Sequence, residues 1–300
     1  MPIALRKQFN ELVQENISLA PYTSARIGGP ADYLITVRDA GELASVVLAC
    51  WENRQQYLLL GAGSNLLVSD KGFHGLVILN KAKATQFRPG SSPSVWAESG
   101  VLFSNLAHRC AAQGFSGLEW AATIPGTVGG AIYGNAGAFG GDTAHNLLQA
   151  EVLTQTGREL WPAEKLEYAY RSSLLKRGKL LGLVLSGEFR LENGDPALIQ
   201  TTINQLTARR KESQPPGASM GSMFKNPPAD FAGRLIEAAG LKGARIGNAE
   251  ISTLHANFFI NDGETRASDV KALIDLAKQT VKEKFDVNLE LEVELVGEWE

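Results

Sequence analysis

The spacing of apolar residues predicts that the chain begins with one helix followed by two strands. ELASVVLACWENRQQ (42–56) has helical periodicity, and Asp39 and Glu42 before it have the spacing of a capping box. The apolar run YLLL at 57–60 and the segment LVILN at 76–80 are short enough for buried strands. We therefore expect a capped helix and two strands in the first third of the chain.

The middle of the chain mixes both periodicities. VLFSNLAHRCAAQG (101–114) has helical spacing and ends on glycine, which favours a helix C-terminus. AEVLTQTG (150–157) and LLGLVLSGEFRL (180–191) are strand-like. Because helices and strands do not alternate one for one, the pattern predicts an α+β fold and disfavours a regular doubly wound sheet.

The last third is predicted to hold three helices and a final strand. After a turn at 192–196, a helix over 196–213 leads into the proline pair at 215–216. Helical patterns recur at 230–240 and 268–285. The final segment NLELEVELVG (288–297) alternates apolar and acidic residues, so we expect one continuous strand.

Composition and charge exclude several classes of protein. The 300 residues are 44% hydrophobic with a net charge of −3, so a globular protein without a basic nucleic-acid-binding surface is expected. The N-terminus has no signal-like apolar run, and no segment reaches the roughly 18 apolar residues of a membrane span. Cys50 and Cys110 lack metal-ligand spacing and are predicted to be buried thiols. We expect a cytoplasmic, metal-free protein.

Two glycine clusters are the first indication of a ligand. One is Gly61-Ala-Gly-Ser-Asn65 and the other is IPGTVGGAIYGNAGAFGG (124–141). Neither has the spacing of a dinucleotide fingerprint or of a P-loop. Glycines let backbone N–H groups approach phosphates, although each cluster alone could be only a tight turn. From the residues themselves we infer a ligand that carries phosphates.

Seven segments occur along the chain in this order: TSARIGGPAD (23–32), LLGAGSNLLVSD (59–70), GLEWAATIPGTVGGAIYGNAGAFGGD (117–142), YRSS (170–173), GSMFKNP (221–227), AGLKGARIGNAEISTLHANFFIN (239–261) and LELEVELVG (289–297). Taken together and in order, they resemble the UDP-N-acetylenolpyruvoylglucosamine reductases. The resemblance covers nearly the whole chain. It implies a flavin-binding fold of the vanillyl-alcohol-oxidase type, with non-covalent FAD between two subdomains and a third, substrate-binding domain.

The resemblance also implies domain bounds and cofactor contacts. The expected domains are 1–85 (first FAD-binding subdomain), 86–195 (second FAD-binding subdomain) and 196–300 (substrate-binding domain). The expected FAD contacts are Gly61, Gly63, Ser64, Asn65, Gly126, Thr127, Gly129 and Gly130. Both glycine clusters would then serve one cofactor.

The activity implied by this resemblance is NADPH-dependent, FAD-mediated reduction of UDP-N-acetylglucosamine enolpyruvate to UDP-N-acetylmuramate, a step in peptidoglycan precursor synthesis. By the same resemblance, Ser222 donates a proton to the enolate-like intermediate, and Arg171 and Glu292 face its carboxylate. Read from spacing alone, Ser222 could be a turn serine and Arg171 a solvated surface residue. Glu292 could equally be one of a solvent-facing acidic row with Glu290 and Glu294.

The remaining site residues and alternatives follow from the same segments. Lys225 and Asn226 are expected to bind the substrate, and His255 is expected either to contact the substrate or the nicotinamide or to have a structural hydrogen-bonding role. About fifty residues separate Arg171 from Ser222, which resembles the short, type II subfamily and leaves open what replaces the longer subfamily's tyrosine loop. A silent nucleotide-binding module and an oxidase on the same fold are the alternative functions.

Overall fold

The computed structural model describes residues 8–9 and 12–299 and divides the chain into two compact units. Much of the N-terminal segment that bears on the signal prediction lies outside the described residues. The first unit comprises Met1–Val13, Ile35–Gly61 and Val77–Arg209. The second unit comprises Gln14–Leu34, Ala62–Leu76 and Arg210–Glu300. The predicted divisions after residues 85 and 195 stay predictions.

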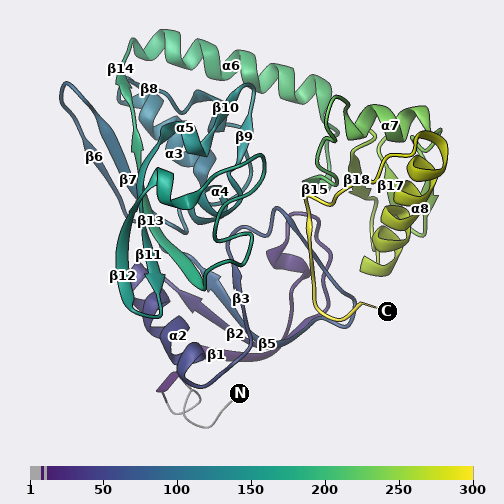
Figure 1. The fold of residues 1–300 in the computed structure, drawn as a ribbon, viewed down its shortest axis with the longest axis horizontal. Helices are drawn as coiled ribbons and strands as arrows, with labels where there is room; N and C mark the ends of the chain where they lie inside the picture. The colour runs from purple at the N-terminus through teal and green to yellow at the C-terminus, as the bar shows by residue number, and fades with distance from the viewer. Residues whose placement is uncertain (1–7, 10–11, 300) are drawn as a thin grey trace. The chain divides into compact units, whose positions relative to one another are not determined.

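The first unit is built on a five-stranded antiparallel sheet of order β12-β11-β13-β7-β6 (Figure 1). Its strands are β6 (Thr85–Arg88), β7 (Ser94–Glu98), β11 (Leu147–Thr154), β12 (Gly157–Pro162) and β13 (Gly182–Arg190). Helices α3 (Phe103–Ala112) and α4 (Val128–Gly134) belong to the same unit. The helix predicted over 101–114 and the strands predicted near 150–157 and 180–191 are thereby confirmed, with ends shifted by a few residues.

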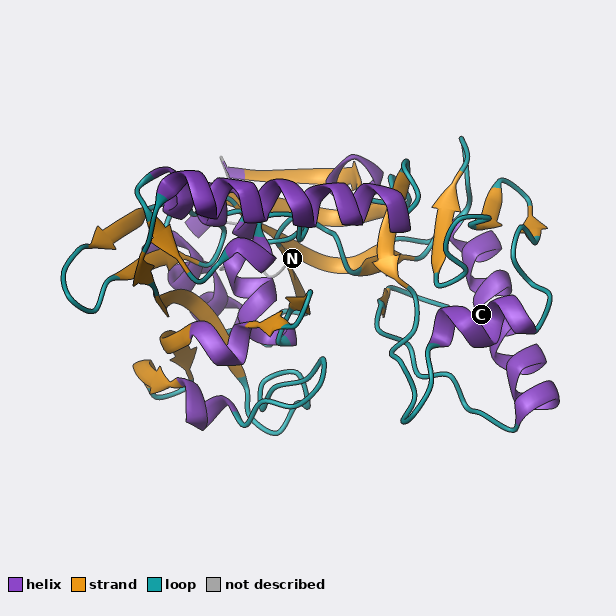
Figure 2. Ribbon diagram, turned by 90° about the horizontal axis from the view of Figure 1, so that it is seen from above, coloured by secondary structure: helices purple, strands orange, loops and turns teal. Residues whose placement is uncertain are grey.

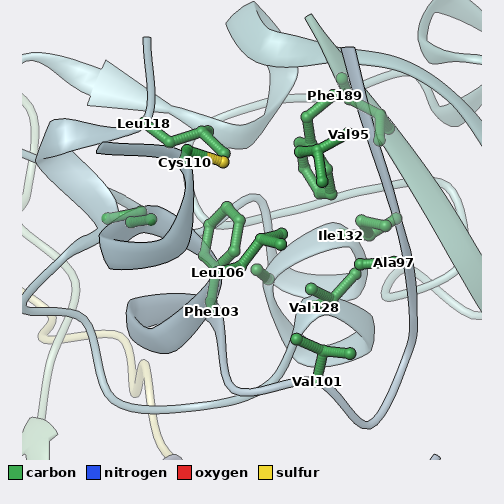
Figure 3. Packing of buried hydrophobic residues seen from close by; sticks show 14 of the residues in the cluster. Val95, Ala97, Val101, Phe103, Leu106, Cys110, Leu118, Val128, Ile132 and Phe189 are labelled. Carbon is green, nitrogen blue, oxygen red and sulfur yellow. The ribbon is translucent and has the colours of Figure 1, made fainter. Parts of the chain in front are cut away.

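Aromatic packing joins α3 to this sheet (Figure 3). The Phe103 ring lies 5.5 Å edge-on from Trp120 and 5.3 Å from Phe189 of β13, measured between ring centroids. Val128 and Ile132 of α4 are fully buried in the same cluster. Burying one such side chain contributes about 1.5–3 kcal/mol, so this cluster fixes α4 against the sheet.

Both cysteines are buried free thiols, as predicted. Burial raises the pKa of Cys50 to about 11 and that of Cys110 to about 12. The reactive thiolate is therefore scarce at neutral pH.

Helix α2 (Ala40–Glu52) begins at the predicted cap but ends four residues early. Asp39 Oδ1 accepts a hydrogen bond from Glu42 N at 2.8 Å, as a capping box requires. Glu42 accepts instead from Arg38 N at 2.7 Å, so only half of the predicted box forms. Arg54 has a φ of 51°, and this left-handed backbone stops the helix before residue 56.

The second unit contains a four-stranded sheet of order β15-β18-β17-β16 with helices α7 (Ala232–Ala238) and α8 (Ala267–Phe285). The strands are β15 (Ala218–Ser222), β16 (Arg245–Ile246), β17 (Ala249–Ile251) and β18 (Phe258–Asn261). Figure 2 shows α7 and α8 as the helical part of this unit. Both predicted helices are confirmed. Their apolar faces share one buried cluster with Met223, Phe224 and Phe259.

The predicted continuous strand at 288–297 is wrong in extent. Strand β19 covers only Glu294–Val296 and pairs in parallel with β4 (Leu66–Val68). Before it, Leu291 forms a single bridge with Phe224. The segment therefore pairs first with Phe224 and then with β4. Its alternating pattern does not correspond to one continuous strand of a single sheet.

The other elements complete the chain. A sheet of order β1-β2-β5-β3 contains β1 (Val13–Ser18), β2 (Pro30–Val37), β3 (Tyr57–Leu60) and β5 (Phe73–Asn80). Short elements are β8 (Phe115–Ser116), β9 (Gly137–Ala138), β10 (Gly141–Asp142), α5 (Thr143–Asn146) and β14 (Glu192–Asn193). The long helix α6 (Pro196–Ser213) has the predicted bounds, as does β3. In the described part of the chain, no helix is long and apolar enough to cross a membrane.

Candidate functional site

The two glycine clusters meet within the first unit at Gly61 and Thr127. Thr127 is the N-cap of α4, and its Oγ1 accepts from Gly130 N at 3.4 Å. A Cβ built on Gly61 would lie 2.7 Å from that Oγ1, closer than real Cβ atoms come to a neighbour. Glycine at 61 is thus needed for the close approach. This contact supports the prediction that Gly61 and the second cluster contribute to one site.

The glycines of the second cluster have different roles. Gly126 has a φ of 123°, which side chains disfavour. Gly129 is packed against Ser99: its N–H donates to Ser99 O at 2.8 Å, and a Cβ would lie 2.8 Å from Ser99 Cβ. At Gly130 a Cβ would contact only Thr127 Oγ1, at 3.7 Å. The first turn of α4 therefore carries bare backbone at Gly130, whose N–H is bonded to the Thr127 cap, and the Gly129 N–H donates to Ser99 O.

This arrangement fits a cofactor with a diphosphate such as FAD. Backbone without side chains at a capped helix start lets phosphate oxygens approach N–H groups. Gly61, Gly126, Thr127 and Gly130 are the first-unit residues that would hold it. Among the described residues there is no group of three or more His, Cys, Asp or Glu side chains suited to a metal ion.

The predicted cofactor residues Gly63, Ser64 and Asn65 belong to the second unit. Gly63 has a φ of 60°, and a Cβ there would lie 2.3 Å from Tyr22 O. Ser64 is half-buried in the turn before β4. The Asn65 side chain has a neighbour that sequence reasoning missed, because Asn65 Nδ2 donates to Glu292 O at 3.0 Å. Asn65 O in turn accepts from Glu294 N at 3.0 Å.

Arg171 lies in the first unit, in a loop anchored on α4. Ser173 Oγ donates to Tyr133 O at 2.6 Å, and Asn135 Nδ2 donates to Ala169 O at 3.1 Å. Arg171 itself is half-buried with a φ of 54°. The loop that presents Arg171 is thus attached to the C-terminal end of the helix whose N-terminus carries the glycine cluster.

Ser222 and Glu292 come together in the second unit through Met223. Ser222 ends β15 after a bulge, and Gly221 before it has a φ of 78°. Glu292 N donates to Met223 O at 2.9 Å. The Ser222 hydroxyl makes no hydrogen bond with any other residue that the structure describes. The two predicted catalytic residues therefore lie on neighbouring segments, and Arg171 belongs to the other unit.

The predicted substrate residues surround this pair. Lys225 N donates to Glu290 O at 2.8 Å, and the Lys225 ammonium forms an ion pair with the Glu290 carboxylate. Asn226 Oδ1 accepts from Ala232 N at 3.1 Å, where α7 begins. Glu290 thus differs from Glu292 in forming an ion pair with Lys225. The spacing of the acidic residues alone did not separate the two.

His255 has one ring nitrogen in a structural hydrogen bond. Asn257 N donates to its Nδ1 at 3.2 Å, so the proton of the neutral ring lies on Nε2. Burial is the main cause that lowers the pKa of His255, and the imidazole is therefore neutral at pH 7. This bond is consistent with the structural alternative for His255, and its contact with a ligand stays a prediction.

Asn257 is the main residue of this region that the predicted site omitted. It is 3% exposed, its Oδ1 accepts from Phe224 N at 2.9 Å, and its Nδ2 donates to Phe224 O at 2.8 Å. The available signal was its place in the segment HANFFIN beside His255. Its partner lies 33 residues away, so local spacing could not identify the pairing.

Comparison with known proteins gives a consistent result. A model described as "FAD binding domain" matches residues 31–161, and one described as "UDP-N-acetylenolpyruvoylglucosamine reductase, C-terminal domain" matches residues 212–296. The reductase of that name from Chloroflexus aggregans is 46% identical, over 99% of both chains. That of Rubrobacter xylanophilus is 43% identical, over 93% of this chain and 94% of its own.

A solved structure agrees with these relatives. The crystal structure of UDP-N-acetylenolpyruvylglucosamine reductase from Thermus caldophilus has a TM-score of 0.80 and 36% identity, covering 94% of this chain and 98% of its own. The predicted α+β, vanillyl-alcohol-oxidase-type flavin-binding fold is confirmed. The fold and the matches define an FAD-dependent oxidoreductase. More narrowly, the chain belongs to the UDP-N-acetylenolpyruvoylglucosamine reductase family.

Proposed function

We propose that this protein reduces UDP-N-acetylglucosamine enolpyruvate to UDP-N-acetylmuramate with NADPH, in peptidoglycan precursor synthesis. Full-length identity of 46% to a curated reductase and the match to an FAD binding domain support the proposal. Gly61, Gly126, Thr127 and Gly130 would hold FAD non-covalently, and the cofactor would supply the hydride-transfer chemistry between NADPH and the vinylic carbon of the substrate. The protein's own residues would bind the carboxylate, hold the substrate and supply the proton.

The observation that carries the proposal is the adjacency of Ser222 and Glu292. Hydride addition builds negative charge beside the substrate carboxylate, and the reaction ends when the α-carbon receives a proton. Ser222, whose hydroxyl is not used by another described residue, would donate that proton. Glu292, joined to Met223 by the 2.9 Å backbone bond, would donate a hydrogen bond to the carboxylate in its protonated form.

Arg171, Lys225 and Asn226 would bind the anionic groups of the substrate. Arg171 would present the planar donor fork of its guanidinium, which suits a developing enolate. Lys225 and Asn226 would bind the substrate, with Lys225 close to its phosphates or carboxylate. The Lys225 ammonium already has the Glu290 carboxylate as a partner, so substrate binding would compete with that ion pair or extend it.

The setting of the enzyme follows from the same proposal. We place it in the cytoplasm, with a UDP-sugar and NADPH as its partners and neither nucleic acid nor membrane. The short distance between Arg171 and Ser222 in the sequence supports the type II subfamily.

Anaerobic half-reactions test the proposal. The purified protein is expected to be yellow, to bleach with NADPH, and to regain its absorbance when UDP-N-acetylglucosamine enolpyruvate is added without oxygen. Bleaching that this substrate does not reverse would overturn the substrate assignment. Rapid recovery in air without substrate would instead identify an oxidase.

A further inference from the structure

We propose that Asn257 is a positioning residue for the Ser222 hydroxyl, an inference that rests on the proposed role of Ser222 as proton donor. The Asn257 side chain binds both main-chain groups of Phe224, accepting from its N–H at 2.9 Å and donating to its carbonyl at 2.8 Å. An amide is the side chain that offers one acceptor and one donor in this spacing. The Asn257 amide thus makes the two hydrogen bonds to Phe224 that the backbone of a neighbouring strand would otherwise make. Phe224 lies two positions after Ser222.

The Asn257 backbone strengthens the same attachment. Met223 N donates to Asn257 O at 2.8 Å, next to the two side-chain bonds. From the other side, Glu292 N donates to Met223 O at 2.9 Å. The Met223–Phe224 segment is therefore held between Asn257 and Glu292. A shift of Asn257 would move Ser222 relative to Glu292.

The chain before Ser222 is not held in the same way. The pairing of β15 with β18 is interrupted between Ser219 and Ser222. A Cβ built on Gly221 would meet no atom within 4 Å, so the space beside this residue where a side chain would lie is open. A bulge redirects the side chain that follows it, and here the following residue is Ser222. Ser222 itself pairs with Phe258, the residue after Asn257, so the direction of its hydroxyl depends on the stretch of chain that Asn257 and Phe258 hold.

The amide chemistry makes this role testable by pH. In Asn257→Asp the shape is kept, but an ionised carboxylate has no proton to donate to Phe224 O, and two oxygens then face each other. Protonation of the introduced carboxyl restores the donor. Burial raises the pKa of such a group, so recovery is expected as the pH falls toward the acidic side of neutrality.

The experiment measures both half-reactions of the holoenzyme anaerobically in Asn257→Asp between pH 5.5 and 8.5, as ratios to the unchanged protein. We expect flavin reduction by NADPH within about twofold, because Ser222 takes no part in it. Recovery of flavin absorbance with the enolpyruvyl substrate should slow about 100-fold at pH 8.5, since a displacement near 1 Å costs about that much. The slowing should diminish as the pH falls.

The matched control is Asn261→Asp, at the last residue of β18, the strand that begins directly after Asn257. Asn261 Nδ2 also donates to a backbone carbonyl, that of Ala25, at 2.8 Å, and its Oδ1 accepts from Thr265 N at 3.4 Å, so both side-chain bonds go to residues outside 222–225. We expect both half-reactions of this variant to stay within about threefold of the unchanged protein. An equal, pH-dependent slowing in Asn261→Asp would overturn the inference, because the effect would then not depend on the bonds to Phe224.

A double-mutant cycle separates this inference from the proposed function. If Asn257 acts through Ser222, Asn257→Asp should slow the second half-reaction little further once Ser222→Ala is present. Multiplying effects, or equal slowing of both half-reactions, would overturn the positioning role. Normal turnover in Ser222→Ala alone would instead refute the proposed role of Ser222. Should Asn257→Asp fail to retain flavin, Asn257→Ser, which keeps at most one of the two bonds, takes its place in the cycle.

Discussion

Two regions hold the predicted site residues, and different chemistry holds each of them in place. In the first unit, Gly61 lies so close to Thr127 that a Cβ at position 61 would be 2.7 Å from Thr127 Oγ1. In the second unit, the Asn257 and Asn65 amides bind the backbone of Phe224 and Glu292. The first region is therefore sensitive to added atoms, and the second is sensitive to lost hydrogen-bonding groups.

The largest effect is expected from Ser222→Ala, which removes the reacting hydroxyl of the second region without changing its packing. Flavin reduction by NADPH should be unchanged. Recovery with the enolpyruvyl substrate should slow by about 100- to 10,000-fold, the usual contribution of a positioned proton donor. Rapid mixing of the two half-reactions measures both rates.

Ser219→Ala is the matched control for that variant, because Ser219 lies in the same strand β15. Its rates should stay close to those of the unchanged protein. Equal slowing of both half-reactions in Ser222→Ala would show that Ser222 is structural. The second region would then no longer differ from the first by holding the proton donor.

A smaller effect is expected from Gly61→Ala in the first region. The added Cβ would lie 2.7 Å from Thr127 Oγ1, and Thr127 cannot move easily, since its side chain is branched and caps α4. Overpacking of this kind costs about 1–3 kcal/mol. We expect FAD affinity to fall by about tenfold or more, measured by titrating the flavin-free protein with FAD and following flavin fluorescence.

Gly134→Ala distinguishes crowding from a general need for glycine. Gly134 also lies in α4, but a Cβ there meets no atom within 4 Å. Alanine favours helix by about 1 kcal/mol over glycine, so FAD affinity and stability should be retained or increased. Equal losses of affinity in both variants would argue against the specific contact between Gly61 and Thr127.

Local signals account for much of what the sequence predicted. The helix at 196–213 and the strand at 57–60 have the predicted bounds, because periodicity and flanking turns determine both. The Asp39 cap was equally visible, since its acceptor geometry requires only residues three apart. The resemblance supplied what periodicity could not, including the choice of Ser222 and Glu292.

Contacts between distant segments account for what was missed. The last strand was predicted too long because the alternation at 288–297 does not reveal that Leu291 bridges Phe224 while Glu294 pairs with Leu66. Asn257 escaped prediction for the same reason, as an amide in a sequence does not indicate which backbone it will bind. Such positions depend on the folded register, which a single sequence does not contain.

The smallest effect is expected from Asp70→Asn, which weakens another side-chain-to-backbone attachment of the second unit. The Asp70 carboxylate accepts from Ala267 N at 2.7 Å and from Ser268 N at 3.0 Å, and so caps α8 from 197 residues away. Loss of the charge should lower the free energy of unfolding by about 1 kcal/mol at pH 7. Urea denaturation followed by circular dichroism measures the change, with Asp275→Asn, an exposed carboxylate of α8, as control.

The pH dependence of this difference follows from the pKa of Asp70. Burial acts to raise that pKa, but the hydrogen bonds from Ser268 and Ala267 and the charge of Arg266 outweigh it and lower it below 3.8. At a pH between the two pKa values, Asp70 is ionised in the folded protein but largely protonated in the unfolded chain. The stabilisation is therefore complete above the pKa of the unfolded chain. It is lost as the pH falls through the lower folded value. The difference between the unchanged protein and Asp70→Asn should shrink below pH 3.8, and a difference that stays constant there would show that shape, not charge, makes the cap.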